Sequence, residues 1–180
     1  MIKHGSKTIH HTLSAAILND LFGIQARSGC ACAGPFGHEL LNIPKELSDK
    51  FIDVILKVLN GYKPGWTRIA IHYTASEREV DYTLFALSLT AWFAPLLLPD
   101  YNFDPYDGSW RHVRSADRRA VVSIQEALTS KFDTTSEYVV ADEDSLNSLF
   151  EKQKREALTI ISLKLGESIY LDSAHIEAFS

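Results

Sequence analysis

The sequence has few cysteines and no large excess of charge of either sign. Its two cysteines, Cys30 and Cys32, stand two positions apart, which places them poorly for a disulfide with each other and gives no secreted disulfide framework. The formal net charge is −5 over 180 residues, so no basic surface for nucleic acid or for an anionic membrane is indicated. We therefore expect a cytoplasmic protein whose partners are neutral small molecules or other proteins.

Long apolar runs are also lacking. The first seven residues, MIKHGSK, contain no apolar core of the length that a signal peptide needs. The nearest later candidate, 91–98, is short and contains a proline, so we expect no segment that spans a membrane. The chain is nevertheless 46% hydrophobic and 11% aromatic, which suffices for the core of one domain of ordinary size.

Helix and strand signals alternate along the chain, which predicts an α/β (α+β) fold. Apolar residues spaced three and four apart, with proline near helix starts and glycine after helix ends, indicate the helices. They run from Leu13 to Gly23, from Pro44 to Gly61, from Ser76 to Pro95, over 118–131 and over 145–165. Strands are predicted at 66–73, 138–140 and 168–171, and a hairpin around 104–108.

The third of these helices has the clearest boundary signals. Ser76 and Glu79 have the spacing of a capping box, and Pro95 is expected to stop the helix. Its predicted apolar positions are Val80, Leu84, Leu87 and Ala91. Beyond Arg114 the composition becomes more charged, so we place a soft domain boundary there, between residues 1–115 and an α+β extension at 116–180.

Both cysteines lie in a glycine-rich turn that also contains an arginine and a histidine. The segment 22–38 reads FGIQARSGCACAGPFGH, in which Arg27, Gly29 and Cys32 form the pattern Arg-x-Gly-x-x-Cys. A cysteine is a nucleophile only as thiolate, and Arg27 and His38 could supply the electropositive setting that a thiolate needs. The alternative interpretation is that both thiols are inert packing residues of a tight turn.

This loop resembles the cysteine loop in the C-terminal small domain of pyridoxal-phosphate-dependent class V aminotransferases and cysteine desulfurases. The family's next two elements are similar to KPGWTRIAIHY at 63–73 and to SEREVDY at 76–82. A hairpin of the nearest aminotransferase subgroup is similar to 101–112. The resemblance covers about residues 9–113, and the extension at 116–180 has no counterpart in it.

The resemblance implies the small domain of a fold-type-I enzyme, in which helices cover one face of a short sheet. Family enzymes carry their cofactor lysine in a large domain that precedes the small one, and this sequence lacks that domain. We therefore expect a C-terminal fragment, a split-gene product or a small domain that works with a large-domain partner chain, and a homodimer is compatible with the family. Pyridoxal phosphate is the implied cofactor, but it is not expected to bind this chain alone, and no cofactor-binding residue is predicted.

The resemblance also assigns roles to individual residues. Cys32 aligns with the desulfurase nucleophile, whose thiolate attacks the sulfur of a substrate cysteine, and Cys30 falls where many desulfurases have a histidine. Both are candidate catalytic residues. Arg68 matches the arginine that pairs with the α-carboxylate of the amino-acid substrate, because a planar guanidinium offers two parallel donors to two oxygens. Arg27 and His38 complete the predicted set of substrate-binding residues. Arg27 could equally orient the cysteine loop without contacting the substrate.

Simpler interpretations accompany each of these residues. Arg68 could form an ordinary surface salt bridge at the edge of a strand. His38 and the two cysteines lack a fourth ligand and the usual zinc spacing, so no metal site is predicted. His10 and His11 precede the first predicted helix and are expected to cap it or pack against it.

Two functions follow as hypotheses, and whether the chain is itself an enzyme is left open. In the first, it is the C-terminal part of an aminotransferase or cysteine desulfurase-type enzyme and is inactive alone. In the second, it is a non-catalytic protein-binding or sulfur-relay module. The extension at 116–180 distinguishes the two hypotheses. In an independent module, the extension would cover the apolar face that otherwise contacts a large domain. A large apolar patch left uncovered would indicate a partner chain.

Overall fold

The computed structural model describes residues 2–5, 7–29, 34–115 and 142–177, with the side chains of the last helix described as far as Glu167. Along these ranges the chain forms helices, short 3-10 turns and short strands. In order they are β1 (Lys3–His4), β2 (Lys7–Thr8), α1 (His11–Phe22), β3 (Arg27–Gly29), α2 (Gly34–Leu40), α3 (Lys45–Leu56), η1 (Asn60–Tyr62), β4 (Trp66–Arg68), α4 (Glu77–Leu97), η2 (Leu98–Asp100), β5 (Tyr101–Phe103), β6 (Trp110–His112) and α6 (Glu143–Glu177).

The described strands form three separate two-stranded antiparallel ribbons. β1 pairs with β2, β3 with β4 and β5 with β6, each over two or three residues. Helices and ribbons together make a mixed α+β fold, as the sequence predicted. The prediction of one short sheet is wrong for the described residues, because each described strand pairs with a single neighbour and the three ribbons do not join.

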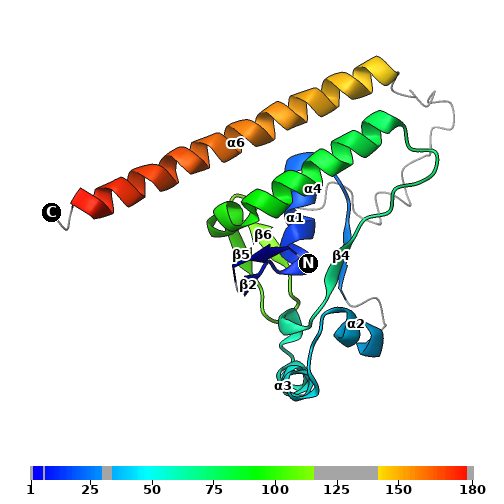
Figure 1. Ribbon diagram of the computed structural model, residues 1–180, viewed down its shortest axis with the longest axis vertical. Coiled ribbons are helices and arrows are strands. Elements are labelled where there is room, and N and C mark those ends of the chain that lie inside the picture. The colour runs from blue at the N-terminus through cyan, green and yellow to red at the C-terminus, as the bar shows by residue number, and fades with distance from the viewer. Residues whose placement is uncertain (1, 6, 30–33, 116–141, 178–180) are drawn as a thin grey trace, which may run out of the picture.

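Three helices, α1, α4 and α6, pack against one another and hold the hydrophobic core (Figure 1). α6 runs along α4 and α1, and its C-terminal half extends past the rest of the described chain. The core contains Leu13, Ile17, Leu18 and Phe22 of α1, Ala86, Ala94 and Leu97 of α4, and Ala157 and Ile161 of α6. The described helix of the extension therefore shares a core with the residues before 115.

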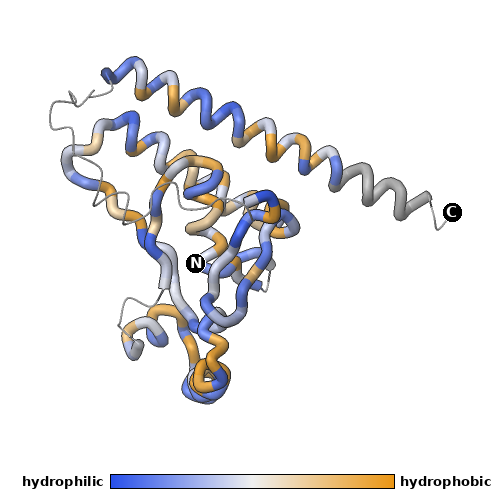
Figure 2. The backbone as a smooth tube through the Cα atoms, turned by 180° about the vertical axis from the view of Figure 1, so that it is seen from behind, coloured by the Kyte–Doolittle hydropathy of each residue, from blue (hydrophilic) through white to orange (hydrophobic). Residues whose placement is uncertain are grey.

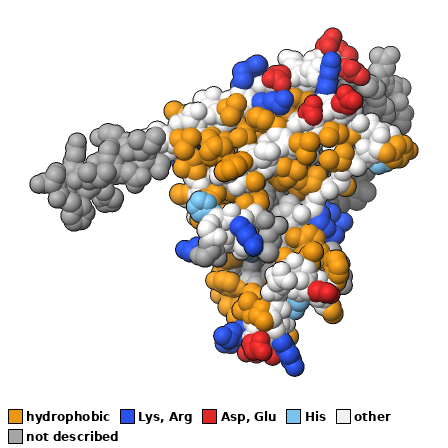
Figure 3. Space-filling view, in the orientation of Figure 1, with side chains coloured by type: hydrophobic (Ala, Val, Ile, Leu, Met, Phe, Trp, Pro, Cys, Tyr) orange, Lys and Arg blue, Asp and Glu red, His pale blue; other side chains and the backbone are white. Residues whose placement is uncertain are grey.

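The buried face of α4 differs from the face that apolar spacing predicted. The buried residues are Tyr82, Ala86, Thr90 and Ala94, four positions apart, followed by Leu97. The predicted positions Leu84 and Ala91 are exposed instead, and Trp92 is 78% exposed. Figure 3 shows that hydrophobic side chains gather on the outer face over α4. Because α4 is apolar on most sides, spacing alone does not select the face whose small side chains let the neighbouring helices approach closely.

In length and hydropathy, Glu77–Asp100 meets the requirements of a membrane-spanning helix. The expectation that no segment could span a membrane is therefore wrong by length and hydropathy. That expectation considered only residues 91–98 and left out the helical turns that precede them. A helix in a protein core can have the same length and hydropathy. Here, one face of α4 packs on α1 and α6.

Tyr82 joins α4 to both neighbouring helices. Its hydroxyl donates to the carbonyl of Phe22 at 2.8 Å, and the side-chain amide of Gln153 in α6 is hydrogen-bonded to the same hydroxyl. Its ring stacks on Phe150, with the centroids 4.2 Å apart. Burial raises the pKa of Tyr82 to about 12, so at neutral pH the hydroxyl keeps its proton and remains a donor.

Two helix boundaries lie where local signals predicted them. α1 ends before Gly23, whose φ of 65° is left-handed and whose N–H donates to the carbonyl of Asn19 at 3.0 Å. At the start of α4, the N–H of Ser76 donates to the Glu79 carboxylate at 2.8 Å, and the N–H of Glu79 donates to the Ser76 hydroxyl at 3.3 Å. The capping box is confirmed, as is the hairpin around 104–108, which joins β5 to β6.

Three other predicted boundaries are wrong. The strand at 66–73 shortens to the three residues of β4, because its partner β3 is only three residues long. Pro95 lies inside α4, which continues to Leu97, since one missing N–H near a helix end removes a single hydrogen bond. The predicted strand at 168–171 belongs to α6, where its backbone groups bond within the helix. Two further predictions lie outside the described residues: the helix at 118–131 and the strand at 138–140.

α3 stands apart from the three-helix core (Figure 1). Its predicted start at Pro44 is confirmed, but it ends at Leu56, short of the predicted end, and Val58 takes a left-handed φ of 65°. No residue of α3 is buried, although Figure 2 shows that the helix contains both apolar and polar residues. Leu47 and Phe51 of its apolar side line a cavity described below.

Ile161→Ala should lower the free energy of unfolding by about 2–5 kcal/mol, because Ile161 is 3% exposed and its truncation leaves a core cavity. Its neighbour Ile160 is 38% exposed, so Ile160→Ala, the matched control, should cost less than about 1 kcal/mol. Urea unfolding of both variants measures the difference. Equal losses would contradict the packing of α6 on α1 and α4.

Candidate functional site

The two arginines predicted to bind substrate lie directly opposite each other on one ribbon. Arg27 in β3 and Arg68 in β4 are Cα partners in the antiparallel pairing, although they are far apart in the sequence. Side chains of directly opposed residues lie on the same face of a ribbon, with Cβ atoms about 5 Å apart. Both arginines are exposed. Two guanidinium groups therefore share one open face.

No acidic residue within the described ranges neutralises this pair. Arg111 forms an ion pair with Asp107 at 3.6 Å, but neither Arg27 nor Arg68 forms one with any described carboxylate. Like charges directly opposite each other destabilise an antiparallel pair. An anion with two coplanar oxygens, such as a carboxylate, would relieve that repulsion and accept parallel hydrogen bonds from the guanidinium groups.

The ribbon is held in place from its other side. The Thr67 hydroxyl donates to the carbonyl of His11 at 2.7 Å, which fixes β4 to the start of α1. A Cβ at Gly65 would lie 2.8 Å from the carbonyl carbon of Gly29, so glycine at 65 is what lets the two chain segments approach this closely. The register that opposes the arginines depends on both contacts.

His38 belongs to α2 and is engaged with α3. Its Nδ1 is 3.0 Å from the hydroxyl of Ser48. α2 packs on the ribbon through Trp66, because a Cβ at Gly37 would lie 2.9 Å from the Trp66 ring. His38 therefore lies in α2, next to the ribbon. Its described hydrogen bond is with Ser48 of α3 and not with Arg27 or Arg68.

Cys30 and Cys32 lie outside the described residues, and their catalytic role stays a prediction. β3 ends at Gly29, the last described residue before them, and α2 begins at Gly34 after them. Of the predicted site residues, the structure brings together Arg27 and Arg68 and places His38 one element away.

A hydrogen-bond centre at His10 organises the surroundings of this ribbon. His10 Nε2 donates to the carbonyl of Gly61 at 2.8 Å, and the indole N–H of Trp110 donates to His10 Nδ1 at 3.2 Å. Thr12 Oγ1 lies 2.6 Å from the same Nδ1 and donates to the carbonyl of Gly108 at 2.7 Å. Burial lowers the pKa of His10, and a neutral ring is the form that this pattern of bonds requires.

The sequence predicted only that His10 caps or packs. His10 makes no side-chain capping bond to α1, but its ring packs against Phe103 and Trp110, so the packing role is confirmed. Its partners are distant in the sequence, so no local pattern identifies them.

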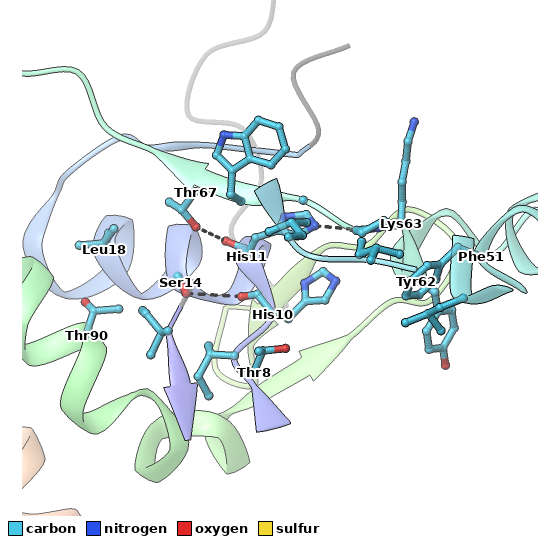
Figure 4. Close-up of a pocket in the computed structure, with 18 of the residues that line it drawn as sticks. Thr8, His10, His11, Ser14, Leu18, Phe51, Tyr62, Lys63, Thr67 and Thr90 are labelled. Carbon is cyan, nitrogen blue, oxygen red and sulfur yellow. Dashed lines mark hydrogen bonds between the residues drawn. The ribbon is translucent and has the colours of Figure 1, made fainter. Parts of the chain in front are cut away.

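A cavity of about 560 Å³ lies between α1, α3, α4 and the segment 62–67 (Figure 4). It does not fit pyridoxal phosphate. No aspartate or glutamate occurs among its described lining residues to face a pyridine nitrogen, and the one lysine, Lys63, is exposed. This cavity therefore does not supply the acid and lysine that the cofactor implied by the family resemblance would need.

Comparison of the chain with protein-family models, with curated protein sequences and with solved structures finds no match. The helices and ribbons define a mixed α+β fold, and the chemistry of the site follows from its own residues.

Acidification from pH 7 to pH 5 should lower the free energy of unfolding. Burial lowers the pKa of His10 and of His11 in the folded protein, so the unfolded chain takes up protons first as the pH falls through the ordinary histidine range. His10→Gln should reduce this dependence, whereas His4→Gln on the exposed strand β1 should leave it unchanged. Urea unfolding at several pH values tests this, and an unaltered slope in His10→Gln would contradict it.

Arg27→Gln should raise the free energy of unfolding at low ionic strength by about 0.2–1 kcal/mol, because it removes a like charge opposite Arg68. In about 1 M salt the gain should disappear, since screening then acts within about 3 Å. Arg111→Gln, which loses an ion pair with Asp107, should give no gain. Destabilisation of Arg27→Gln at low salt would mean that an anionic group already compensates the pair.

Proposed function

We propose that this chain is the small-domain part of a pyridoxal-phosphate-dependent enzyme of the class V aminotransferase or cysteine desulfurase type. In this function it recognises the carboxylate of an amino-acid substrate through Arg27 and Arg68 and is inactive without a partner that supplies the cofactor half. The cysteines Cys30 and Cys32 remain the proposed nucleophile candidates.

The observation that carries the proposal is the cross-strand pairing of Arg27 with Arg68. The sequence pattern selected these two arginines independently, one in the cysteine loop and one in the next family element. Their side chains share an exposed ribbon face on which no described carboxylate balances them. A planar carboxylate is complementary to this face in charge and in hydrogen-bond geometry.

A partner chain is supported by the uncovered apolar surface of α4. Leu84 is 50% exposed and Trp92 78%, so α6 covers only one side of this helix. Exposed apolar patches of this kind mark sites of association.

The alternative function is a non-catalytic binding or sulfur-relay module. The packing of α6 on α1 and α4 favours it, because part of the extension covers a helical face that would otherwise be open. In that case the arginine pair would bind an acidic group of another protein, and free amino acids would not compete for it.

The carboxylate site can be tested by titrating the ¹⁵N-labelled full chain with L-alanine and, separately, with L-alaninamide, which lacks the carboxylate. Alanine should shift the backbone amide signals of Ser28 and Thr67, which lie between the arginine pair and the end of the ribbon. We expect a dissociation constant on the order of millimolar, as suits one exposed ion-paired contact. Arg68→Gln should weaken binding by about tenfold or more.

Arg111→Gln on β6 serves as the matched control and should bind alanine as the unaltered chain does. Equal responses to alanine and alaninamide would contradict carboxylate recognition. Stoichiometric pyridoxal phosphate on one lysine, trapped with borohydride and located by mass spectrometry, would contradict the dependence on a partner.

A further inference from the structure

The arginine pair carries more positive charge than one carboxylate balances. Arg27 and Arg68 are directly opposed on the ribbon, and neither forms an ion pair with a described carboxylate. A guanidinium group keeps its charge throughout the physiological pH range, so this exposed face holds two full positive charges. A ligand with a single carboxylate neutralises one charge and leaves the other unbalanced.

The register of the ribbon gives each arginine a position of its own. The Cβ atoms of directly opposed residues lie about 5 Å apart, and the two side chains are equally long. Each planar guanidinium group presents two parallel donors, which match the two oxygens of one carboxylate. Two guanidinium groups that share one small anion must approach each other against their repulsion. Two carboxylates on one molecule avoid this cost, because each arginine then has a separate partner.

The spacing of the pair indicates the length of such a ligand. The two carboxylate carbons of an extended glutamate are joined by four bonds of about 1.5 Å each, which places them about 5 Å apart. This distance is close to the spacing of the two Cβ atoms. Aspartate has one bond fewer between its carboxylates and spans the pair less well. The geometry therefore favours a ligand of the length of glutamate.

The next residue pair on the same face leaves room beside the arginines. Gly29 lies opposite Trp66 in the ribbon, and alternate residues of a strand share a face. A Cβ built on Gly29 would meet no described atom within 4 Å. The half-buried ring of Trp66, which contacts Gly37 of α2, gives this part of the face an apolar border. The carbon chain between two carboxylates can therefore lie beside the pair.

We infer that the substrate is an amino acid with an acidic side chain, of the length of glutamate, and that Arg27 is the residue that selects it. Arg68 pairs with the α-carboxylate, and Arg27 pairs with the carboxylate of the substrate side chain. This inference rests on the proposed function, because it adds a second carboxylate to the one that the proposed function already requires.

The test compares L-glutamate with L-glutamine, which have the same shape and differ in the charge of the side chain. Each is titrated into the ¹⁵N-labelled full chain, and the amide signals of Ser28 and Thr67 report binding. Glutamate should bind about three- to fivefold more tightly, as one exposed ion pair supports. In about 1 M salt the ratio of the two affinities should fall toward one, since screening then acts within about 3 Å.

Three variants test the assignment to Arg27, which is exposed and whose replacement leaves the core intact. Arg27→Gln should reduce the ratio to about one, because Arg68 still binds the α-carboxylate and the second cation is lost. Arg27→Lys keeps the charge and should retain a ratio above one. Arg111→Gln is the matched control and should leave the ratio unchanged, since Arg111 lies on β6 and pairs with Asp107.

Equal affinities for glutamate and glutamine at low salt would overturn the inference, as would an unchanged ratio in Arg27→Gln. Tighter binding of methyl phosphate than of glutamate would also overturn it, because the pair would then suit one shared dianion. The comparison of alanine with alaninamide tests carboxylate recognition itself. A preference for alanine together with equal binding of glutamate and glutamine would leave the proposed function standing without this inference.

Discussion

The imidazole of His10 accepts a hydrogen bond from the indole of Trp110 and donates one to the carbonyl of Gly61. It thereby ties the first residues of α1 to η1 and to β6, which are far from it in the sequence. The segment that follows η1 contains β4, so the position of Arg68 depends on this bond. Its loss would free the chain on which both the ribbon and the cavity are built, which is why a half-buried, neutral histidine is the central constraint of the structure.

The two faces of the short ribbon β3–β4 have different surroundings. Thr67 points to α1 and bonds the carbonyl of His11, and Arg68, the next residue, points to the other face, as strand alternation requires. The arginine face carries an unfavourable feature, two like charges directly opposed with no described carboxylate paired to either. Departures of this kind from local stability are typical of functional positions, where a ligand supplies the missing interaction.

Local chemistry explains which elements could be predicted. Gly23 ends α1 and the pair Ser76–Glu79 begins α4, because a helix terminus is satisfied by residues within a few positions of it. The buried face of α4 could not be predicted, since the helix is apolar on most sides and its neighbours choose the face. The length of β4 was overestimated for a related reason, because a strand ends where its partner ends.

For the candidate site, the sequence by itself determined the residue types and their local order: two arginines, a histidine and two cysteines in recognisable patterns. It also determined the helix caps, whose hydrogen bonds are local. Only the tertiary structure decided that Arg27 faces Arg68 and that His38 bonds toward α3. The physical reason is that register and burial arise from contacts between distant segments, and these depend on how all the elements pack together.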